Sequence, residues 1–226
     1  DGPLPARSER LAQAARVVSW FGARDETFVR RLRAIAPGAV LAPPIPATDT
    51  AVWEHFLSTV WGQASDPARL VPVAVPEPLA EEGRRRLGAM GWDGTTRLLM
   101  IHPGAGGMAK RWPVEGFARL LEALLRDEQL GVVIHEGPAD TDAVTALAAR
   151  HWDTIRLAEP PLPLLAGVLS HVAAYVGNDS GISHLSATVG TPSVVLLTTA
   201  TLAWRPWAAA ARPVVVTTAM LEEDDV

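Results

Sequence analysis

Apolar and polar residues follow two different periods along this chain, one typical of helices and one typical of strands. Apolar residues three or four positions apart predict amphipathic helices, which we place at residues 11–16, 25–35, 50–61, 79–90, 113–124, 140–150, 162–169 and 181–189. Short apolar runs between them predict buried strands at residues 17–20, 40–41, 97–101, 132–135, 155–157, 173–176, 193–197 and 214–216. Because strands and helices alternate, we predict an α/β protein with right-handed parallel crossovers and a doubly wound sheet.

Residues that cap or break helices place several of these boundaries. Asp25 is positioned to cap the second helix, and Phe28, Leu32 and Ile35 share one face of it. Pro113 occupies a first helical position, where its missing N–H has no cost.

Prolines interrupt the helical period between the third and fourth predicted helices, at positions 67, 72, 76 and 78. We interpret residues 67–78 as a linker between a first domain, residues 1–66, and a second domain, residues 79–226. A long surface loop within a single domain is the alternative interpretation.

Composition narrows the class of protein. The 226 residues can bury a full core, and 48% apolar residues, 20% charged residues and a net charge of −5 give no electrostatic reason to bind nucleic acid. The chain has no cysteine and no apolar run near the roughly 20 residues that span a bilayer. It begins at Asp1 without a secretory signal, and we interpret it as part of a longer protein.

The first loop of chemical interest, residues 102–112, lies between a predicted strand and the helix at Pro113. Glycines including Gly104 and Gly106 would let a ligand approach the backbone closely, and Lys110 and Arg111 add positive charge beside a helix N-terminus. A diphosphate is the expected guest, although the spacing is neither a P-loop nor a dinucleotide fingerprint. A flexible turn with solvated basic side chains is the alternative.

The second loop, residues 136–140, also joins a strand to a helix. Asp140 has the ordinary position of a helix N-cap, and this is the interpretation that position alone favours. A carboxylate at this edge could otherwise accept hydrogen bonds from sugar or ribose hydroxyls, with Glu136 and Asp142 as rival candidates.

The third loop, residues 177–184, carries more polar groups than a helix cap requires. Free N–H groups at Gly181, the Ser180 hydroxyl and the Asp179 carboxylate converge beyond one predicted strand, and His184 lies one helical turn further on. We expect Ser180 and the N–H groups to bind phosphate oxygens and Asp179 to bind sugar hydroxyls. His184 could bind a phosphate, orient Asp179 or be purely structural.

The remaining histidines do not suggest a metal site. His55, His135, His151 and His171 lack metal-ligand spacing, whereas His102 lies in the first loop, where it could reach a ligand.

Together the three loops resemble those of glycosyltransferase family 9, the heptosyltransferase family. The resemblance is carried by HPGAGGMAKRWP at residues 102–113, GPAD at residues 137–140 and GNDSGISHLSATVGTP at residues 177–192. It implies a GT-B architecture, in which residues 1–66 form the closing portion of an acceptor-binding domain and residues 79–226 form a nucleotide-sugar-binding Rossmann-like domain. It also implies that donor-binding residues are Gly104, Gly106, Lys110, Asp140, Asp179, Ser180, Gly181 and His184.

The implied reaction transfers a heptose or related sugar from an ADP-sugar to a lipopolysaccharide-core-type acceptor, with inversion and without a metal ion or other cofactor. The general base of the family is an aspartate near the start of the first domain. We expect it upstream of this chain and name no catalytic base here. A lipid-linked acceptor further implies a cytoplasmic enzyme with peripheral contact to the inner membrane; the oligomeric state is not specified.

Two other functions fit the same loops. Another GT-B enzyme, such as a UDP-sugar transferase or epimerase, would share the architecture, although the sequence lacks the paired-glutamate pattern common near the nucleotide ribose of those enzymes. No base-reading residue is identifiable from the sequence, so ADP rather than UDP comes from the resemblance. A non-catalytic module that binds a nucleotide would also keep these loops.

Overall fold

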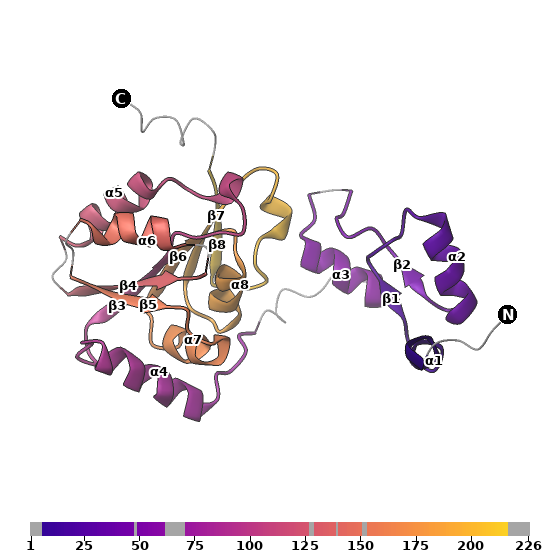
Figure 1. Cartoon of the computed structure of the whole chain (residues 1–226), viewed down its shortest axis with the longest axis horizontal. Helices are drawn as coiled ribbons and strands as arrows, with labels where there is room; N and C mark the ends of the chain where they lie inside the picture. The colour runs from indigo at the N-terminus through magenta and orange to yellow at the C-terminus, as the bar shows by residue number, and fades with distance from the viewer. Residues whose placement is uncertain are drawn as a thin grey trace. The chain divides into compact units, whose positions relative to one another are not determined.

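The computed structural model describes residues 6–47, 49–61, 71–126, 129–138, 140–150 and 153–216. The chain divides into two compact units, residues 1–66 and residues 67–226, each of which is described by itself (Figure 1).

The first unit contains three helices and two short strands in its described residues. Its elements are α1 (Ala6–Ala12), β1 (Val18–Ser19), α2 (Glu26–Ile35), β2 (Val40–Leu41) and α3 (Val52–Trp61). The strands pair in parallel, with Val18 opposite Val40. Asp25 caps α2 as predicted, since its carboxylate accepts hydrogen bonds from the N–H groups of Thr27 and Phe28.

The predicted helix at residues 11–16 is wrong in its bounds. The helix ends at Ala12, and the chain then extends toward β1, where the β-branched Val17 and Val18 favour strand over helix.

The second unit is a three-layer α/β domain. In chain order its elements are α4 (Glu77–Ala89), β3 (Arg97–His102), η2 (Met108–Lys110), α5 (Val114–Leu124), β4 (Leu130–Glu136), α6 (Thr141–Ala148), β5 (Thr154–Ala158), α7 (Leu162–Leu169), β6 (Ala174–Asn178), α8 (Gly181–Thr188), β7 (Ser193–Leu197), η3 (Leu202–Trp204) and β8 (Ala211–Val215). The six strands pair in parallel in the order β5-β4-β3-β6-β7-β8. The predicted doubly wound parallel sheet is therefore confirmed.

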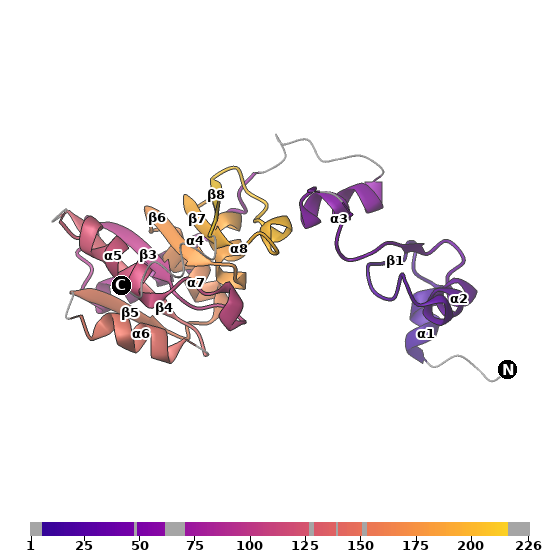
Figure 2. The same ribbon diagram turned by 90° about the horizontal axis from the view of Figure 1, so that it is seen from above.

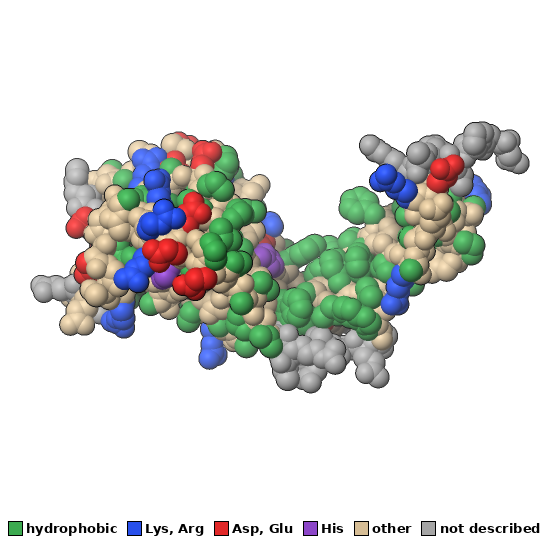
Figure 3. Space-filling view, turned by 90° about the horizontal axis from the view of Figure 1, so that it is seen from below, with side chains coloured by type: hydrophobic (Ala, Val, Ile, Leu, Met, Phe, Trp, Pro, Cys, Tyr) green, Lys and Arg blue, Asp and Glu red, His purple; other side chains and the backbone are tan. Residues whose placement is uncertain are grey.

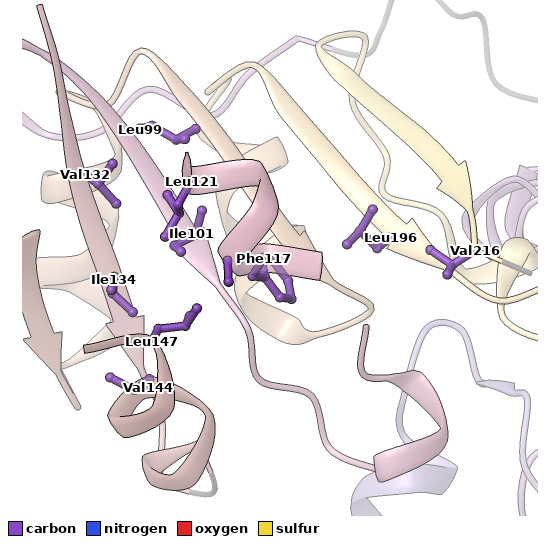
Figure 4. Close-up of a cluster of buried hydrophobic side chains, with 11 residues drawn as sticks. Leu99, Ile101, Phe117, Leu121, Val132, Ile134, Val144, Leu147, Leu196 and Val216 are labelled. Atoms are coloured by element: carbon purple, nitrogen blue, oxygen red, sulfur yellow. The ribbon is translucent and has the colours of Figure 1, made fainter. Parts of the chain in front are cut away.

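Helices cover both faces of the sheet because successive strand residues point to opposite sides. Figure 1 shows α5 and α6 above the strands and α4 and α7 below them, and Figure 2 shows the domain from above. Leu99 and Ile101 of β3 pack on one face with α5 and α6, where Phe117 and Leu121 are fully buried (Figure 4). Leu98 and Met100 of the same strand pack on the other face with α4, α7 and α8, together with Leu87, Leu165, Leu169 and Tyr175.

Two glycines let α4 and α7 pack with their backbones almost in contact. A β-carbon on Gly167 would lie 2.0 Å from the Leu79 carbonyl oxygen, and one on Gly83 would lie 2.3 Å from the Gly167 carbonyl carbon. Any side chain at either position would force the helices apart.

The fourth helix begins two residues earlier than predicted. Glu77 and Pro78 form the first turn of α4, where proline loses no hydrogen bond, so they are not part of a linker. Residues 71–76 contain neither helix nor strand, and residues 67–70 of the predicted linker lie outside the described residues.

The described ranges contain no helix that could span a membrane. Figure 3 shows acidic and basic side chains interspersed on one face of the second unit.

The strand order reverses between β3 and β6, the two central neighbours of the sheet. From β3 the chain winds outward through β4 and β5, and then returns to β6 on the other side of β3. The loops that follow β3 and β6 therefore lead to helices on opposite faces of the sheet. In open α/β sheets ligands bind at the carboxyl edge beside such a reversal. These two loops are the first and third loops.

Candidate functional site

Asn178, the last residue of β6, joins the first and third loops. Its side-chain oxygen accepts a hydrogen bond from the Trp112 N–H at 2.9 Å, and its side-chain nitrogen donates to the Pro103 carbonyl oxygen at 2.8 Å. The residue is completely buried. Both ends of the glycine-rich segment are thereby held against the end of β6.

Lys110 and Asp179 meet across this junction. Lys110 Nζ lies 2.8 Å from Asp179 Oδ2, with the amine side chain 42% exposed and the carboxylate side chain 8% exposed. The short distance makes this contact an ion pair between the two loops. The predicted phosphate-binding cation and the predicted sugar-binding carboxylate therefore lie together.

Ser180 is the N-cap of α8, as the position of the third loop predicts. Its hydroxyl accepts a long hydrogen bond of 3.4 Å from the Ser183 N–H. The Ser183 hydroxyl donates to the Asn178 carbonyl oxygen at 2.6 Å and lies 2.9 Å from the hydroxyl of the buried Tyr175. These hydroxyl groups support the turn between β6 and α8. They leave the N–H groups at the start of α8 available to an anion.

His184 lies half-buried on α8, close enough to Lys110 and Asp179 for both charges to act on it. Burial lowers the pKa of the His184 imidazole; Asp179 opposes this effect and Lys110 adds to it. The ring is therefore neutral at pH 7 and can either donate or accept a hydrogen bond.

The glycines of the site differ in the space around them. A β-carbon at Gly106 or Gly181 would meet no protein atom within 4 Å, so both present open backbone to a ligand. A β-carbon at Gly104 would lie 2.0 Å from the Asp140 carboxylate. Gly104 is thus required by the protein's own packing.

Asp140 is not the side-chain cap that its position favours. It stands at the N-cap of α6, but its side chain makes no cap hydrogen bond with that helix. The carboxylate is 6% exposed and turns back toward the sheet, where it accepts a hydrogen bond from the Gly137 N–H at 3.0 Å. The backbone of the second loop competes with the helix end for this carboxylate.

The side chains of Arg111 and His102 contact other groups of the protein. The Arg111 guanidinium donates to the Ala105 carbonyl oxygen from Nε at 3.2 Å and from Nη2 at 3.0 Å. His102 is 3% exposed and lies under the loop, with its Nδ1 3.1 Å from Nδ1 of His135. This burial gives no support to a contact between His102 and a ligand, which stays a prediction.

The two buried imidazoles are neutral at pH 7. Burial lowers the pKa of His135 to about 3, with His102 adding to the effect and Glu136 opposing it. Burial also lowers the pKa of His102, although the Asp140 carboxylate opposes this. One ring donates to the other.

The rival carboxylates of the second loop have other environments. Glu136 pairs with Arg156 through contacts of 2.5 and 2.9 Å, and this hydrogen-bonded pair lowers the pKa of Glu136. Asp142 is exposed on α6. Within the residues that the structure describes, no three His, Asp or Glu side chains are grouped so that they could hold a metal ion.

Three contributions to the site are not predicted by the sequence pattern. They are the bridge made by Asn178, the hydroxyl relay from Tyr175 to Ser183, and the pairing of His102 with His135. Asn178 stands inside a predicted motif, but its partners come from a loop more than 60 residues away. Only the strand order makes them neighbours.

The fold and site define an α/β domain in which charged and polar side chains gather at the switch point of a parallel sheet. The model of glycosyltransferase family 9 (heptosyltransferase) matches residues 77–224, which is more than half of the chain. The chain therefore belongs to glycosyltransferase family 9, as the three loops predicted.

A relative of known name is the lipopolysaccharide heptosyltransferase 3 of Escherichia coli (strain K12). It is 32% identical over 132 residues, which cover 55% of this chain and 37% of that protein. The chain thus spans little more than a third of the relative's length.

Solved structures of the same family share the fold. A glycosyl transferase family 9 protein from Veillonella parvula DSM 2008 superposes with a TM-score of 0.67 at 19% identity, covering 81% of this chain and 54% of that one. The ADP-heptose lps heptosyltransferase II of E. coli gives 0.64 at 19% identity over 94% and 72%. E. coli heptosyltransferase WaaC, solved with ADP, gives 0.59 at 18% identity over 96% and 72%. These likenesses confirm the predicted GT-B class of fold.

Proposed function

We propose that this chain supplies the donor-binding part of a glycosyltransferase that moves a heptose, or a related sugar, from an ADP-sugar to a lipopolysaccharide-core-type acceptor. The observation that carries the proposal is the meeting of the first and third loops at the switch point, with Lys110 2.8 Å from Asp179. Family membership supports sugar transfer. The names of the relatives, which include ADP-heptose and lipopolysaccharide, support the choice of donor and acceptor.

The diphosphate of the donor would lie between the first loop and the N-terminus of α8. Open backbone at Gly106 and Gly181, the helix dipole and the Lys110 ammonium all favour anionic oxygens there. Asp179 would accept hydrogen bonds from hydroxyls of the sugar, and the neutral His184 could donate to a phosphate oxygen.

The proposed reaction is a direct displacement. An acceptor oxygen forms a bond with the anomeric carbon as the bond from that carbon to the β-phosphate oxygen breaks, which inverts the centre and releases ADP. Negative charge then grows on the diphosphate, where Lys110 and the α8 N-terminus stabilise it more strongly than in the ground state. The family resemblance implies that no metal ion takes part and that an upstream aspartate accepts the proton of the acceptor hydroxyl.

The partners of the protein follow from this reaction. They are a nucleotide-sugar donor and a lipid-linked saccharide acceptor, with the enzyme in the cytoplasm at the inner face of the membrane that carries the acceptor.

Calorimetric titration of the chain with ADP, UDP and GDP tests the choice of nucleotide. We expect ADP to bind most tightly. Tighter binding of UDP than of ADP would contradict the heptosyltransferase proposal, and binding of none of the three would contradict a nucleotide site.

Lys110→Ala tests the assigned cation. We expect loss of about 1.5–3 kcal/mol of ADP binding free energy, because a charge-assisted hydrogen bond is removed. The lower end is the closer value, since the side chain is 42% exposed to screening water. Arg126→Ala, which removes an exposed positive charge on the same unit, is the matched control.

A labelling experiment gives an independent measurement, because Lys110 is the only lysine of the chain. Acetylation of its amine, followed by mass spectrometry, should slow as ADP is added. Unchanged labelling at saturating ADP, or unchanged ADP affinity in a folded Lys110→Ala variant, would remove Lys110 from the site.

A further inference from the structure

The Asp140 carboxylate packs beneath the first loop. It accepts a hydrogen bond from the Gly137 N–H, in the second loop, at 3.0 Å. On its other side it lies so close to Gly104 that a β-carbon there would be 2.0 Å from the carboxylate carbon. The carboxylate therefore fills the space between the second loop and the backbone of the first.

Arg111 connects this carboxylate to the far side of the first loop. Its Nη2 lies 3.9 Å from Asp140 Oδ1 and also donates to the Ala105 carbonyl oxygen at 3.0 Å. His102 Nδ1 lies 3.8 Å from the second carboxylate oxygen. The carboxylate thus faces the Gly104 backbone, a guanidinium and an imidazole.

A glycine-rich loop needs such support if it is to bind an anion well. Its backbone has many accessible conformations, so a loop that is not held in place pays an ordering cost each time the ligand binds. A carboxylate that is 94% removed from water is in turn stable only when charged or hydrogen-bonding groups face it. Asp140 supports the first loop, and Arg111 of that loop supplies a charged group that faces the buried carboxylate.

We propose that Asp140 is a positioning residue of the donor site. Together with Arg111 it holds residues 104–107 in the conformation that receives the diphosphate, and it does not itself bind the ribose. This inference rests on the proposed function, because the diphosphate is the ligand that the loop would receive.

Binding of ADP and of 2′,3′-dideoxy-ADP distinguishes positioning from ribose contact. Both nucleotides carry the diphosphate, but the second has no ribose hydroxyl for a carboxylate to bind. Calorimetry with the wild-type chain, Asp140→Ala and Asp140→Asn gives affinities for both. If Asp140 positions the loop, Asp140→Ala should weaken both nucleotides by the same factor, tenfold or more.

Asp140→Asn should weaken both nucleotides by a smaller common factor. Its amide oxygen can still accept from the Gly137 N–H, whereas the charge that faces Arg111 is gone. Glu115→Ala removes an exposed carboxylate from the first turn of α5 and should change neither affinity. Thermal unfolding of each variant checks that it is folded. If Asp140→Ala does not fold, the affinities of Asp140→Asn for the two nucleotides distinguish positioning from ribose contact.

Loss confined to ADP would overturn the inference in favour of direct ribose contact, and no loss for either nucleotide would overturn it as well. The proposed function is judged separately by the wild-type chain. If that chain binds neither nucleotide, the proposed function fails before any variant is compared.

Discussion

Asn178→Ala should destabilise the second unit, because this side chain ties both ends of the first loop to the end of β6. The substitution leaves the Trp112 N–H and the Pro103 carbonyl oxygen without the partners that lie at 2.9 and 2.8 Å. Each buried polar group left unsatisfied costs about 1–3 kcal/mol. Because Trp112 is only half-buried, water can satisfy part of the loss, and we expect a total near 2–4 kcal/mol.

Thermal and urea unfolding followed by circular dichroism measure this effect. In a unit of this size each kcal/mol lowers the melting temperature by about 2–4 °C, so the expected drop is on the order of 4–16 °C. Thr188→Ala changes an exposed polar residue of α8 and serves as the control, with a change within about 0.5 kcal/mol. A free energy of unfolding for Asn178→Ala as close to the wild type as that of the control would refute the bridging role.

Two further substitutions test the helix packing and the buried imidazoles. Gly167→Ala should lower the free energy of unfolding by about 1–3 kcal/mol, because its β-carbon would lie 2.0 Å from the Leu79 carbonyl oxygen. The control, Gly88→Ala on α4, meets no atom within 4 Å and should be neutral or slightly stabilising. Equal melting temperatures for the two variants would contradict the close helix contact. The pKa of His135 is lowered to about 3 in the folded chain, against an ordinary value near 6.5. Between these two pH values the unfolded chain binds a proton that the folded chain does not. The free energy of unfolding therefore falls as the pH drops from about 6.5 toward 3, by about 2 kcal/mol at pH 5. Urea unfolding at pH 7 and pH 5 should show a smaller acid loss in His135→Gln than in the wild type, and identical losses would show that this imidazole is not buried neutral.

Most of the fold could be predicted because the periods of burial are local. Residues 193–197 and 162–169 form the predicted strand and helix with the predicted bounds, since each has a clear apolar pattern between breaking residues. Boundaries failed where two local preferences competed. The helix predicted at residues 11–16 gave way to the β-branched run that follows it, and Pro78 proved compatible with a first helical turn.

The candidate site was predictable in its positions but less so in its orientations. Lys110, Asp179, Ser180 and His184 were named from motifs that follow strands, and the parallel sheet brings all four to one edge. Asp140 was named from the same pattern, yet its side chain faces inward. Sequence spacing gives a residue's place along the chain, but the direction of a side chain depends on which distant backbone groups compete for it.

The sequence by itself determined the α/β class, the alternating order of elements and the three loops that carry polar groups, because hydrophobic period, capping and turn chemistry are properties of short segments. The tertiary structure alone decided that β6 returns beside β3, and with it that Asn178 bridges residues 103 and 112 and that Asp140 lies under Gly104. Strand order arises from how the whole sheet buries its two faces, so contacts between segments dozens of residues apart appear only when the chain is folded.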